Sequence, residues 1–442
     1  MRNAHMAVWA LHHFTDSKDP TVLTFPKGHT PRYSDFSIKA ISDETIREGG
    51  ERALYGASDT DKIRLVEKLS QAGIKDIDVG SGMHEAKFLR KLLLTQESFD
   101  SITDDTTFSF NLTLKTWEPL VERLEKDVPR SLLERIYVSI GMIEIGSDRR
   151  LFEHVAERLR KIGVGRLRSS LLNAFSTEID EDKYAHLMAQ IERARSVGID
   201  LIRINDSVGS LYPDSTAVLA ANLVHDNPDT TFYLHGHNDR GLGTANSLVS
   251  VLHGFQIIEG GVAGVGNRAG LAELESITRC FEENNIRVDS GLVDVDRVID
   301  AARFSEQIYL TVPTPYRPVS GFLVTNENAG IVNVPDYLGV TRTVDYFLNR
   351  IGLFPTYLRQ ILIEGGLNEA ALNPAVIEEV YNKLQERFDR QYTSKLAEYE
   401  RLLAQIRAFH DDIVRLPEVI ETAKEVLQEQ PVAVPELVEA HR

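Results

Sequence analysis

Cysteine is almost absent from this sequence of 442 residues, in which Cys280 is the single example. One thiol cannot form an intrachain disulfide, so we expect the chain to work in a reducing compartment. The sequence also lacks an uninterrupted apolar run of about 20 residues, which excludes a typical transmembrane helix. The apolar stretch Met6–Leu11 is too short for the core of a signal peptide. We therefore expect a cytoplasmic protein with no membrane partner.

Positive charge is scarce as well. The 49 Lys and Arg residues are outnumbered by 66 Asp and Glu residues, which gives a formal net charge of −17. Phosphate backbones are bound by clustered Lys and Arg, so this balance predicts no nucleic-acid partner. Apolar residues make up 42% of the chain, enough to fill a large core and unlike a disordered composition. The length suits one large α/β domain with an appendage, or two to three ordinary domains.

Short β-prone runs alternate with amphipathic helical stretches through the first two thirds of the chain. Helices are expected at Asp59–Gln71 and Asp182–Val197, and Gly73, Gly163 and Gly198 stand where helices should end. Eight strands that alternate with helices predict the α/β class and a (β/α)₈ TIM barrel rather than a doubly wound sheet. The expected strands are Ser37–Ser42, Ile74–Val79, Thr107–Leu112, Ile136–Ile140, Arg166–Leu171, Leu201–Ile204, Thr231–His235 and Gln256–Glu259.

Changes in composition divide the chain into four regions. Residues 1–36 form an N-terminal arm broken by Pro and Gly, and residues 37–311 form the barrel domain. Residues 312–372 are rich in Pro and Gly and are predicted to be a linker subdomain. Residues 373–442 read as a helical C-terminal region, in which apolar residues recur every three or four positions. That stripe predicts a helix pair or a coiled-coil contact, and we expect a homodimer.

A pair of histidines, His235 and His237, follows the strand-like run that begins at Thr231. Side chains at positions i and i+2 of a strand point to the same side, so both imidazoles can reach one metal ion. Imidazole ligands suit several divalent cations. In a TIM barrel the carboxyl end of this strand lies on the catalytic face. The alternative is two unrelated histidines on a strand.

Polar residues also stand at the carboxyl ends of other predicted strands. Arg47 and Glu48 follow the first strand, where Glu48 can coordinate a cation and Arg47 can donate to an oxyanion. Asp78 ends the second strand on the same rim, in a position to hold Arg47. Asp43 and Asp206 also end strands. Their alternative role is to close a turn and cap the next helix.

Four segments in this order resemble the DRE-TIM metallolyase superfamily, namely Asp43–Gly49, Asp206–Gly209, His235–Asp239 and Gly264–Gly270. That superfamily contains isopropylmalate and homocitrate synthases and the hydroxymethylglutaryl-CoA lyases. The resemblance extends over roughly residues 37–335 and implies a TIM barrel that depends on Mg²⁺, Mn²⁺ or Zn²⁺. It implies that Glu48, His235 and His237 hold the metal, with Arg47 as the electrophilic group and Asp78 as its support.

The same resemblance implies further site residues and shows departures from the family pattern. Glu144 and Glu327 are the candidates for the general base. Leu271 replaces a possible Asn ligand, and Val332 replaces a His that helps the synthases to activate acetyl-CoA. Glu48 stands where the family has Asp, and Asp78 where it has Glu. The residues expected to bind substrate are Asp206, Ser207, Asn173, Asn238 and Arg268.

Three functions follow from the resemblance. The first is a metal-dependent acyltransferase that joins an acyl-CoA enolate to a 2-oxo acid, with acetyl-CoA as a candidate donor. The second is a lyase or aldolase that cleaves a 3-hydroxy or 2-oxo acid on the same barrel. The third is a barrel without turnover that binds a metabolite or acts as a scaffold. Arg47, Glu48, His235 and His237 keep competent chemical types, which argues against a barrel without turnover. The acyltransferase is the leading hypothesis, because the synthases that the chain resembles also carry a segment after the barrel that ends in a tail.

Overall fold

The computed structural model describes residues 36–114, 116–142, 150–171, 180–329, 344–351 and 353–429. The chain divides into two compact units, Met1–Val324 and Thr325–Arg442. Residues 1–35 of the predicted N-terminal arm lie outside the described part. Glu144, Asn173 and Val332 also lie outside it, so the roles expected of them remain predictions.

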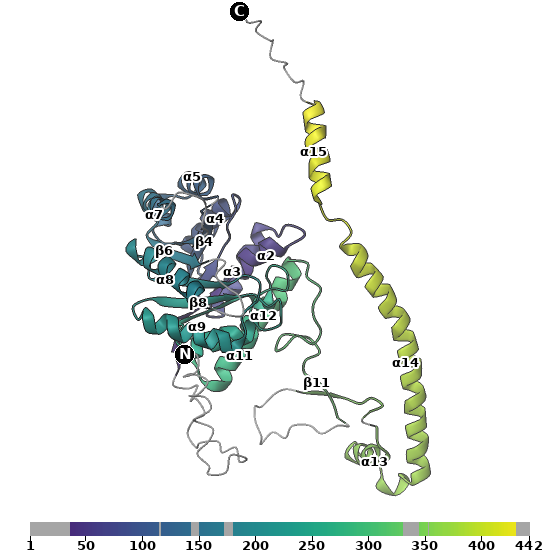
Figure 1. Ribbon diagram of the computed structural model, residues 1–442. Coiled ribbons are helices and arrows are strands. Elements are labelled where there is room, and N and C mark those ends of the chain that lie inside the picture. Colours follow the sequence, from purple (N-terminus) through teal and green to yellow (C-terminus); the bar gives the residue numbers. More distant parts are fainter. Residues whose placement is uncertain are drawn as a thin grey trace, which may run out of the picture. The chain divides into compact units, whose positions relative to one another are not determined.

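The first unit is a closed barrel of eight parallel strands that neighbour one another in chain order (Figure 1). The barrel closes where the first strand pairs with the last, with Ala40 opposite Ile257 and Asp43 opposite Gly260. All eight predicted strands are present, so the predicted TIM barrel is confirmed. The strands are β2 (Ala40–Asp43), β3 (Asp76–Asp78), β4 (Thr107–Thr113), β5 (Tyr137–Met142), β6 (Arg166–Leu171), β7 (Leu201–Asp206), β8 (Thr231–Gly236) and β9 (Ile257–Gly260).

The first predicted strand is split into two pieces. Its start, β1 (Ser37–Ile38), pairs outside the barrel with β10 (Arg287–Val288). At Lys39 the chain changes partner, and its N–H donates to the Gln256 carbonyl at 2.7 Å. Only the piece from Ala40 onward belongs to the barrel, because Ser37 and Ile38 pair with β10 whereas Ala40–Asp43 pair with β9.

Helices follow the strands and surround the barrel (Figure 1). The predicted helix Asp59–Gln71 is α3, whose N-cap Ser58 accepts from the Asp61 N–H at 3.1 Å. Gly73, Gly163 and Gly198 follow helix ends with φ of 94°, 112° and 74°, as expected for glycine at a helix stop. The helices of this unit are α2 (Thr45–Arg52), α3, α4 (Glu85–Ser98), α5 (Trp117–Asp127), α6 (Arg130–Leu133), α7 (Leu151–Ile162), α8 (Glu181–Ser196), α9 (Pro213–Asp226), α10 (Gly243–Leu252), α11 (Leu274–Asn284) and α12 (Val295–Ile308).

Apolar side chains fill the layer between strands and helices, while the inside of the barrel is polar. Phe108 and Phe110 on β4 alternate with Ser109 and Asn111, and all four are buried. Inside the barrel, Arg168 on β6 pairs with Asp76 on β3 at 2.5 Å. A buried charge is tolerated when it is paired, and the loss of one partner typically costs about 3–5 kcal/mol. The barrel lumen is therefore held by ion pairs.

The second unit has a small core of its own, formed by Leu353, Leu358, Leu372 and Ile377. These residues join α13 (Pro355–Glu364) to the start of α14 (Pro374–Phe409). The predicted linker subdomain, 312–372, and the first turns of the helical region thus share one core. Along the chain, the boundary between the two compact units falls inside that predicted subdomain, between Val324 and Thr325.

The predicted helical stripe lies on α14, and α15 (Leu416–Glu429) follows it. Near its start α14 packs against α13, whereas Tyr399 is 60% exposed and Phe409 is 48% exposed. This unit also contains a short parallel pair, β11 (Asn326–Asn328) and β12 (Asp345–Phe347). None of the helices in the described ranges has the length and apolar character that a membrane crossing requires.

Candidate metal centre

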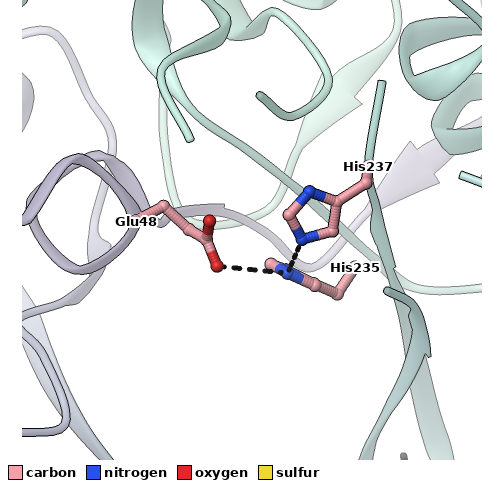
Figure 2. Close-up of side chains that lie close together, drawn as sticks. All are labelled: Glu48, His235 and His237. Carbon is pink, nitrogen blue, oxygen red and sulfur yellow. Dashed lines mark hydrogen bonds and ion pairs between the residues drawn. The ribbon is translucent and has the colours of Figure 1, made fainter. Parts of the chain in front are cut away.

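Three buried side chains converge at the carboxyl end of the barrel. Figure 2 shows the carboxylate of Glu48 and the ring of His237 both next to the same ring nitrogen of His235. Glu48 Oε1 lies 3.5 Å from His235 Nε2, which lies 3.2 Å from His237 Nε2. All three donor atoms lie within 4.8 Å of one another. The structure thus brings together the three residues predicted to hold a metal.

Two different kinds of element carry these donors. His235 is the fifth residue of β8, and His237 follows the strand, where it forms an isolated bridge with Leu271. Glu48 lies one turn into α2, not at the end of the first strand as the sequence suggested. Because α2 begins directly after β2, the helix start directs Glu48 toward the histidines.

The donor geometry fits a divalent cation. Bonds of about 2.0–2.2 Å from nitrogen and oxygen place neighbouring ligands about 3.0–3.5 Å apart, which matches the two measured separations. His235 Nδ1 lies 2.6 Å from Glu259 Oε1. An ionised carboxylate only accepts, so in the neutral ring Nδ1 carries the proton and Nε2 keeps its lone pair for a metal.

The electrostatics of the site also favour a cation. Burial lowers the pKa of His235, but Glu259 and Glu48 outweigh burial and raise it to about 9. Burial and the neighbouring His235 lower the pKa of His237 to about 4. Burial raises the pKa of Glu48, but His235 and Arg47 hold it well below its usual range. The site is therefore built around an ionised carboxylate and one neutral imidazole.

Arg47 lies beside this group and is surrounded by carboxylates. Its Nη2 lies 2.8 Å from Glu48 Oε1 and 3.5 Å from His235 Nε2, and its Nη1 lies 2.9 Å from Glu51 Oε1. Its Nε donates to Glu44. Spacings of three and four residues on a helix bring Glu44 and Glu51 to Arg47. Arg47 Nη2 therefore contacts Glu48 Oε1 and His235 Nε2, which also lie 3.5 Å from each other.

The direct support predicted from Asp78 comes from Glu44 instead. Asp78 accepts from the Gly80 N–H at 3.1 Å and from the Asn111 amide. Burial and the nearby Glu44 raise the pKa of Asp78 well above its usual range. Among the described contacts, Asp78 forms no ion pair with Arg47 and acts on it only through space. Asp78 lies on a strand, whereas Glu44 is held beside Arg47 by the start of α2.

The sequence analysis missed the arginine that connects the supports of the site. Arg203 on β7 donates from Nη1 to Glu44 Oε1 at 2.6 Å and lies 3.5 Å from Glu259 Oε2. It also donates from Nη2 to Asn111 Oδ1 at 3.0 Å. Arg203 thus bridges the carboxylate that holds Arg47 and the carboxylate that holds His235. The alternation of side chains along β7 could have identified Arg203, because it places Arg203 on the same inward face as Asn205.

Asp206, predicted to bind substrate, closes a loop in the structure. It is fully buried, and it accepts from the Ser210 N–H at 2.7 Å and the Leu211 N–H at 2.9 Å. Asp43 is similar, since it accepts from the N–H and the hydroxyl of Thr45 at 3.0 and 2.6 Å. The turn-closing alternative describes both carboxylates, because their oxygens already accept hydrogen bonds from the residues that follow each strand.

Three other predicted substrate residues, Ser207, Asn238 and Arg268, lie on loops at the same rim. Asn238 Oδ1 accepts from the Gly243 N–H at 2.9 Å. Arg268 pairs with Asp239 at 2.9 Å and donates to the Ser207 carbonyl. These contacts tie three rim loops together beside the metal residues. Glu327 belongs to β11 in the second unit, so its predicted role as a base remains a prediction.

Comparison with known proteins identifies the family of this chain. The HMGL-like family model matches residues 39–304. The homocitrate synthase of Sulfolobus acidocaldarius is 25% identical over 316 residues, which cover 69% of this chain and 64% of the relative. That of Sulfurisphaera tokodaii is 27% identical over 307 residues, which cover 66% and 62%. These matches span less than two thirds of the relatives' own length.

A solved structure agrees with the fold. The HMG-CoA lyase from Acinetobacter baumannii, in complex with coenzyme A and 3-methylmalate, matches with a TM-score of 0.50 and 19% identity. The match covers 68% of this chain and 99% of the lyase. At this identity the likeness concerns the barrel alone. Since the family model spans more than half of the chain, the protein belongs to the HMGL-like family, within the DRE-TIM metallolyase superfamily.

Proposed function

We propose that this protein is a divalent-metal-dependent acyltransferase that condenses an acyl-CoA with a 2-oxo acid. The observation that carries the proposal is the convergence of Glu48, His235 and His237 beside Arg47 at the carboxyl end of the barrel. The similarity to homocitrate synthases favours bond formation over cleavage. Acetyl-CoA is the donor that we would test first.

The protein residues have distinct tasks in this scheme. Glu48, His235 and His237 hold the cation, and Glu259 fixes the ring of His235 through Nδ1. When bound, the cation supplies Lewis acidity to the carbonyl and carboxylate oxygens of the 2-oxo acid. Arg47 remains cationic, because its neighbouring carboxylates raise its pKa despite burial, which alone lowers it. Its guanidinium is placed to share the negative charge that develops on the carbonyl oxygen.

The proposed reaction is the condensation of an acyl-CoA with a 2-oxo acid, followed by hydrolysis of the thioester. A base removes a proton from the carbon next to the thioester, and the resulting enolate forms a bond to the keto carbon of the 2-oxo acid. The carbonyl oxygen then takes up a proton, and hydrolysis of the thioester releases free coenzyme A. Cleavage by a lyase reverses only the carbon–carbon step, so it releases no free thiol. The two activities therefore differ in a product that is simple to measure.

The test is a free-thiol assay with acetyl-CoA and a panel of 2-oxo acids. We expect thiol release that needs both the 2-oxo acid and a divalent metal, and that stops on chelation and returns with Mg²⁺, Mn²⁺ or Zn²⁺. Glu48→Gln and His237→Ala should abolish both metal binding and turnover. Thiol release that persists in chelator would contradict the proposal. Cleavage of a hydroxy acid without thiol release would identify the lyase, and an intact fold that binds no metal would indicate the barrel without turnover.

A further inference from the structure

A cavity of about 500 Å³ opens at the other end of the barrel, where the strands begin. Its lining includes Tyr137, Arg166, Leu201, Thr231 and Ile257, which are the first residues of β5 to β9. Lys39, which immediately precedes β2, completes this set. Small-molecule sites typically have volumes of about 300–1,000 Å³, so the cavity is large enough for a small metabolite.

This cavity is separate from the metal centre. Thr231 in its lining and His235 in the metal centre lie on the same strand, four residues apart. A strand rises about 3.3 Å per residue, so the two positions are about 13 Å apart along β8. The packed interior of the barrel, with Tyr233 fully buried between them, fills this distance. A small ligand at one end therefore does not reach the other.

Positive charge gathers at this mouth although the chain is acidic overall. Lys39, Arg160 and Arg166 line the cavity, against the single carboxylate of Asp200. None of the three cations forms an ion pair with Asp200 among the described contacts. Clefts lined by one sign of charge concentrate ligands of the opposite sign. The lining therefore favours an anion.

Of the three cations, Arg166 is the best placed to bind an anion. Its guanidinium lies 5.3 Å from the centre of the Tyr137 ring, and Arg168 lies 4.3 Å from the same ring. The two arginines differ in their counter-charges. Arg168 is buried and pairs with Asp76, whereas Arg166 is exposed and has no hydrogen-bond or ion-pair partner among the described residues. An arginine oriented by a ring, with its donors unused, is arranged for two-point recognition of an oxyanion.

The other two cations are held on the rim by neutral partners. Lys39 Nζ donates to Thr231 Oγ1 at 2.8 Å. Arg160 donates to the Val197 carbonyl at the end of α8. Both contacts position the side chain without neutralising its charge. Together with Arg166 they place three positive charges around one cavity, against the one carboxylate of Asp200.

We propose that this mouth of the barrel is a second ligand site, which binds a small oxyanion-bearing molecule through Arg166, Lys39 and Arg160. The shared chemistry is a phosphate or carboxylate group that accepts from a guanidinium fork. The site does not depend on the reaction carried out at the metal centre. Its test can therefore fail or succeed whichever function the other end of the barrel has.

The experiment is calorimetric titration of the metal-loaded protein at low ionic strength, with inorganic phosphate in one arm and succinate in the other. We expect saturable binding in at least one arm, which identifies a phosphate or a carboxylate ligand. Arg166→Gln should weaken it by about tenfold, because a charge-assisted hydrogen bond is lost. Asp200→Asn should tighten it by about twofold to threefold, because a like charge at the rim is removed.

Arg64→Gln is the matched control, since it removes one exposed arginine from α3, outside the cavity lining. It should leave the affinity unchanged. Two results would overturn the site: no saturable binding in either arm, or an affinity that Arg166→Gln does not alter, which would place the anion elsewhere. If Arg166→Gln misfolds, as judged by circular dichroism, the Asp200→Asn variant decides alone. Weaker binding or no change in that variant would then contradict the site.

Discussion

His235 is held by a carboxylate at each of its ring nitrogens. Glu259 lies 2.6 Å from Nδ1, and Glu48 lies 3.5 Å from Nε2, on the side where the metal is expected. Glu259 is buried and lies 3.5 Å from the positive charge of Arg203, so its position is fixed by a contact of its own. Its task is to orient the imidazole and to hold the proton on Nδ1.

Glu259→Gln should reduce the affinity for a divalent metal by about tenfold to a hundredfold, the usual cost of losing the partner of a metal-bound histidine. The amide can still accept from Nδ1, but it carries no charge. Equilibrium dialysis or calorimetry with Zn²⁺ or Mn²⁺ measures the change. Glu275→Gln makes the same substitution at another fully buried glutamate and should leave metal affinity unaltered. Equal metal affinity in the wild type and Glu259→Gln would contradict this role.

Arg47 allows a separate prediction about turnover. Arg47→Lys keeps a positive charge near Glu44 and Glu48 but lacks the planar fork that contacts both carboxylates. We expect metal affinity to change little while kcat falls by about 10²–10³, as when a single donor to an oxyanion is removed. Steady-state kinetics at saturating metal makes the measurement. A rise in KM with unchanged kcat would show that Arg47 binds the substrate without stabilising the transition state.

At the scale of the element, the short helix α2 places Glu48. Gly49 follows Glu48 and packs against Tyr309, so closely that an added Cβ would lie 2.5 Å from two atoms of the Tyr309 ring. The Tyr309 hydroxyl donates to the Ile46 carbonyl of the same helix at 3.2 Å. Gly50, the next residue, is exposed, and an added Cβ there meets no atom within 4 Å.

Gly49→Ala should therefore destabilise the fold by about 1–3 kcal/mol, the usual cost of overpacking, and should weaken metal binding as α2 shifts. Gly50→Ala on the same helix should be neutral or stabilising by up to about 1 kcal/mol, since alanine favours helix more than glycine. Urea unfolding and metal titration of the two variants test both statements. Similar behaviour of the pair would show that contact with Tyr309 does not position α2.

A second element prediction concerns pH and the start of α11. Glu275 is fully buried, and it accepts from the Ala263 N–H at 2.9 Å and from the Ser320 hydroxyl at 2.8 Å. Burial raises the pKa of Glu275 from 4.5 to about 7, so the folded state binds this proton more tightly than the unfolded state. Stability should therefore decline as pH rises from about 4.5 to about 7.

Glu275→Gln should remove this decline. The amide can accept from Ala263 and donate to Ser320, so the variant should gain stability relative to the wild type as pH rises. The gain should be on the order of 3 kcal/mol by pH 8. Urea unfolding at several pH values measures it. The exposed Glu282→Gln on the same helix serves as the control and should show no such trend. Parallel pH profiles for Glu275→Gln and the wild type would contradict the prediction.

At the scale of the whole molecule, the long helices of the second unit carry exposed apolar residues. Leu402 is 50% exposed and Ile406 is 37% exposed, four residues apart on α14. Val419 and Ile420 on α15 are more than half exposed. Exposed apolar stretches of this length favour association, and a second copy of the chain is the partner that we expect.

Leu402→Glu combined with Ile406→Glu should shift the protein toward a monomer, because two charges would be buried in the contact. Ala397→Glu combined with Ala404→Glu adds the same charge to the opposite side of α14 and should leave the assembly intact. Light scattering at micromolar concentration gives the mass of each variant. A wild-type monomer would contradict the homodimer.

Much of the fold could be predicted from the sequence, because its signals are local. Alternation along each strand and glycine after a helix depend on neighbouring residues, and they located all eight strands. The same alternation brought His235 and His237 to one side of β8. The sequence did not show the start of α2, where Glu44 contacts Arg47, and the supporting role expected of Asp78 remains a prediction.

The sequence by itself determined the barrel, the pair of histidines and the family resemblance, since each is written in a short pattern. Only the tertiary structure decided that Arg203 connects Glu44, which contacts Arg47, to Glu259, which contacts His235. Glu44 and Arg203 are 159 residues apart in the chain, and no local pattern encodes their contact. It exists because closing the barrel brings the inward faces of distant strands into one small, buried space.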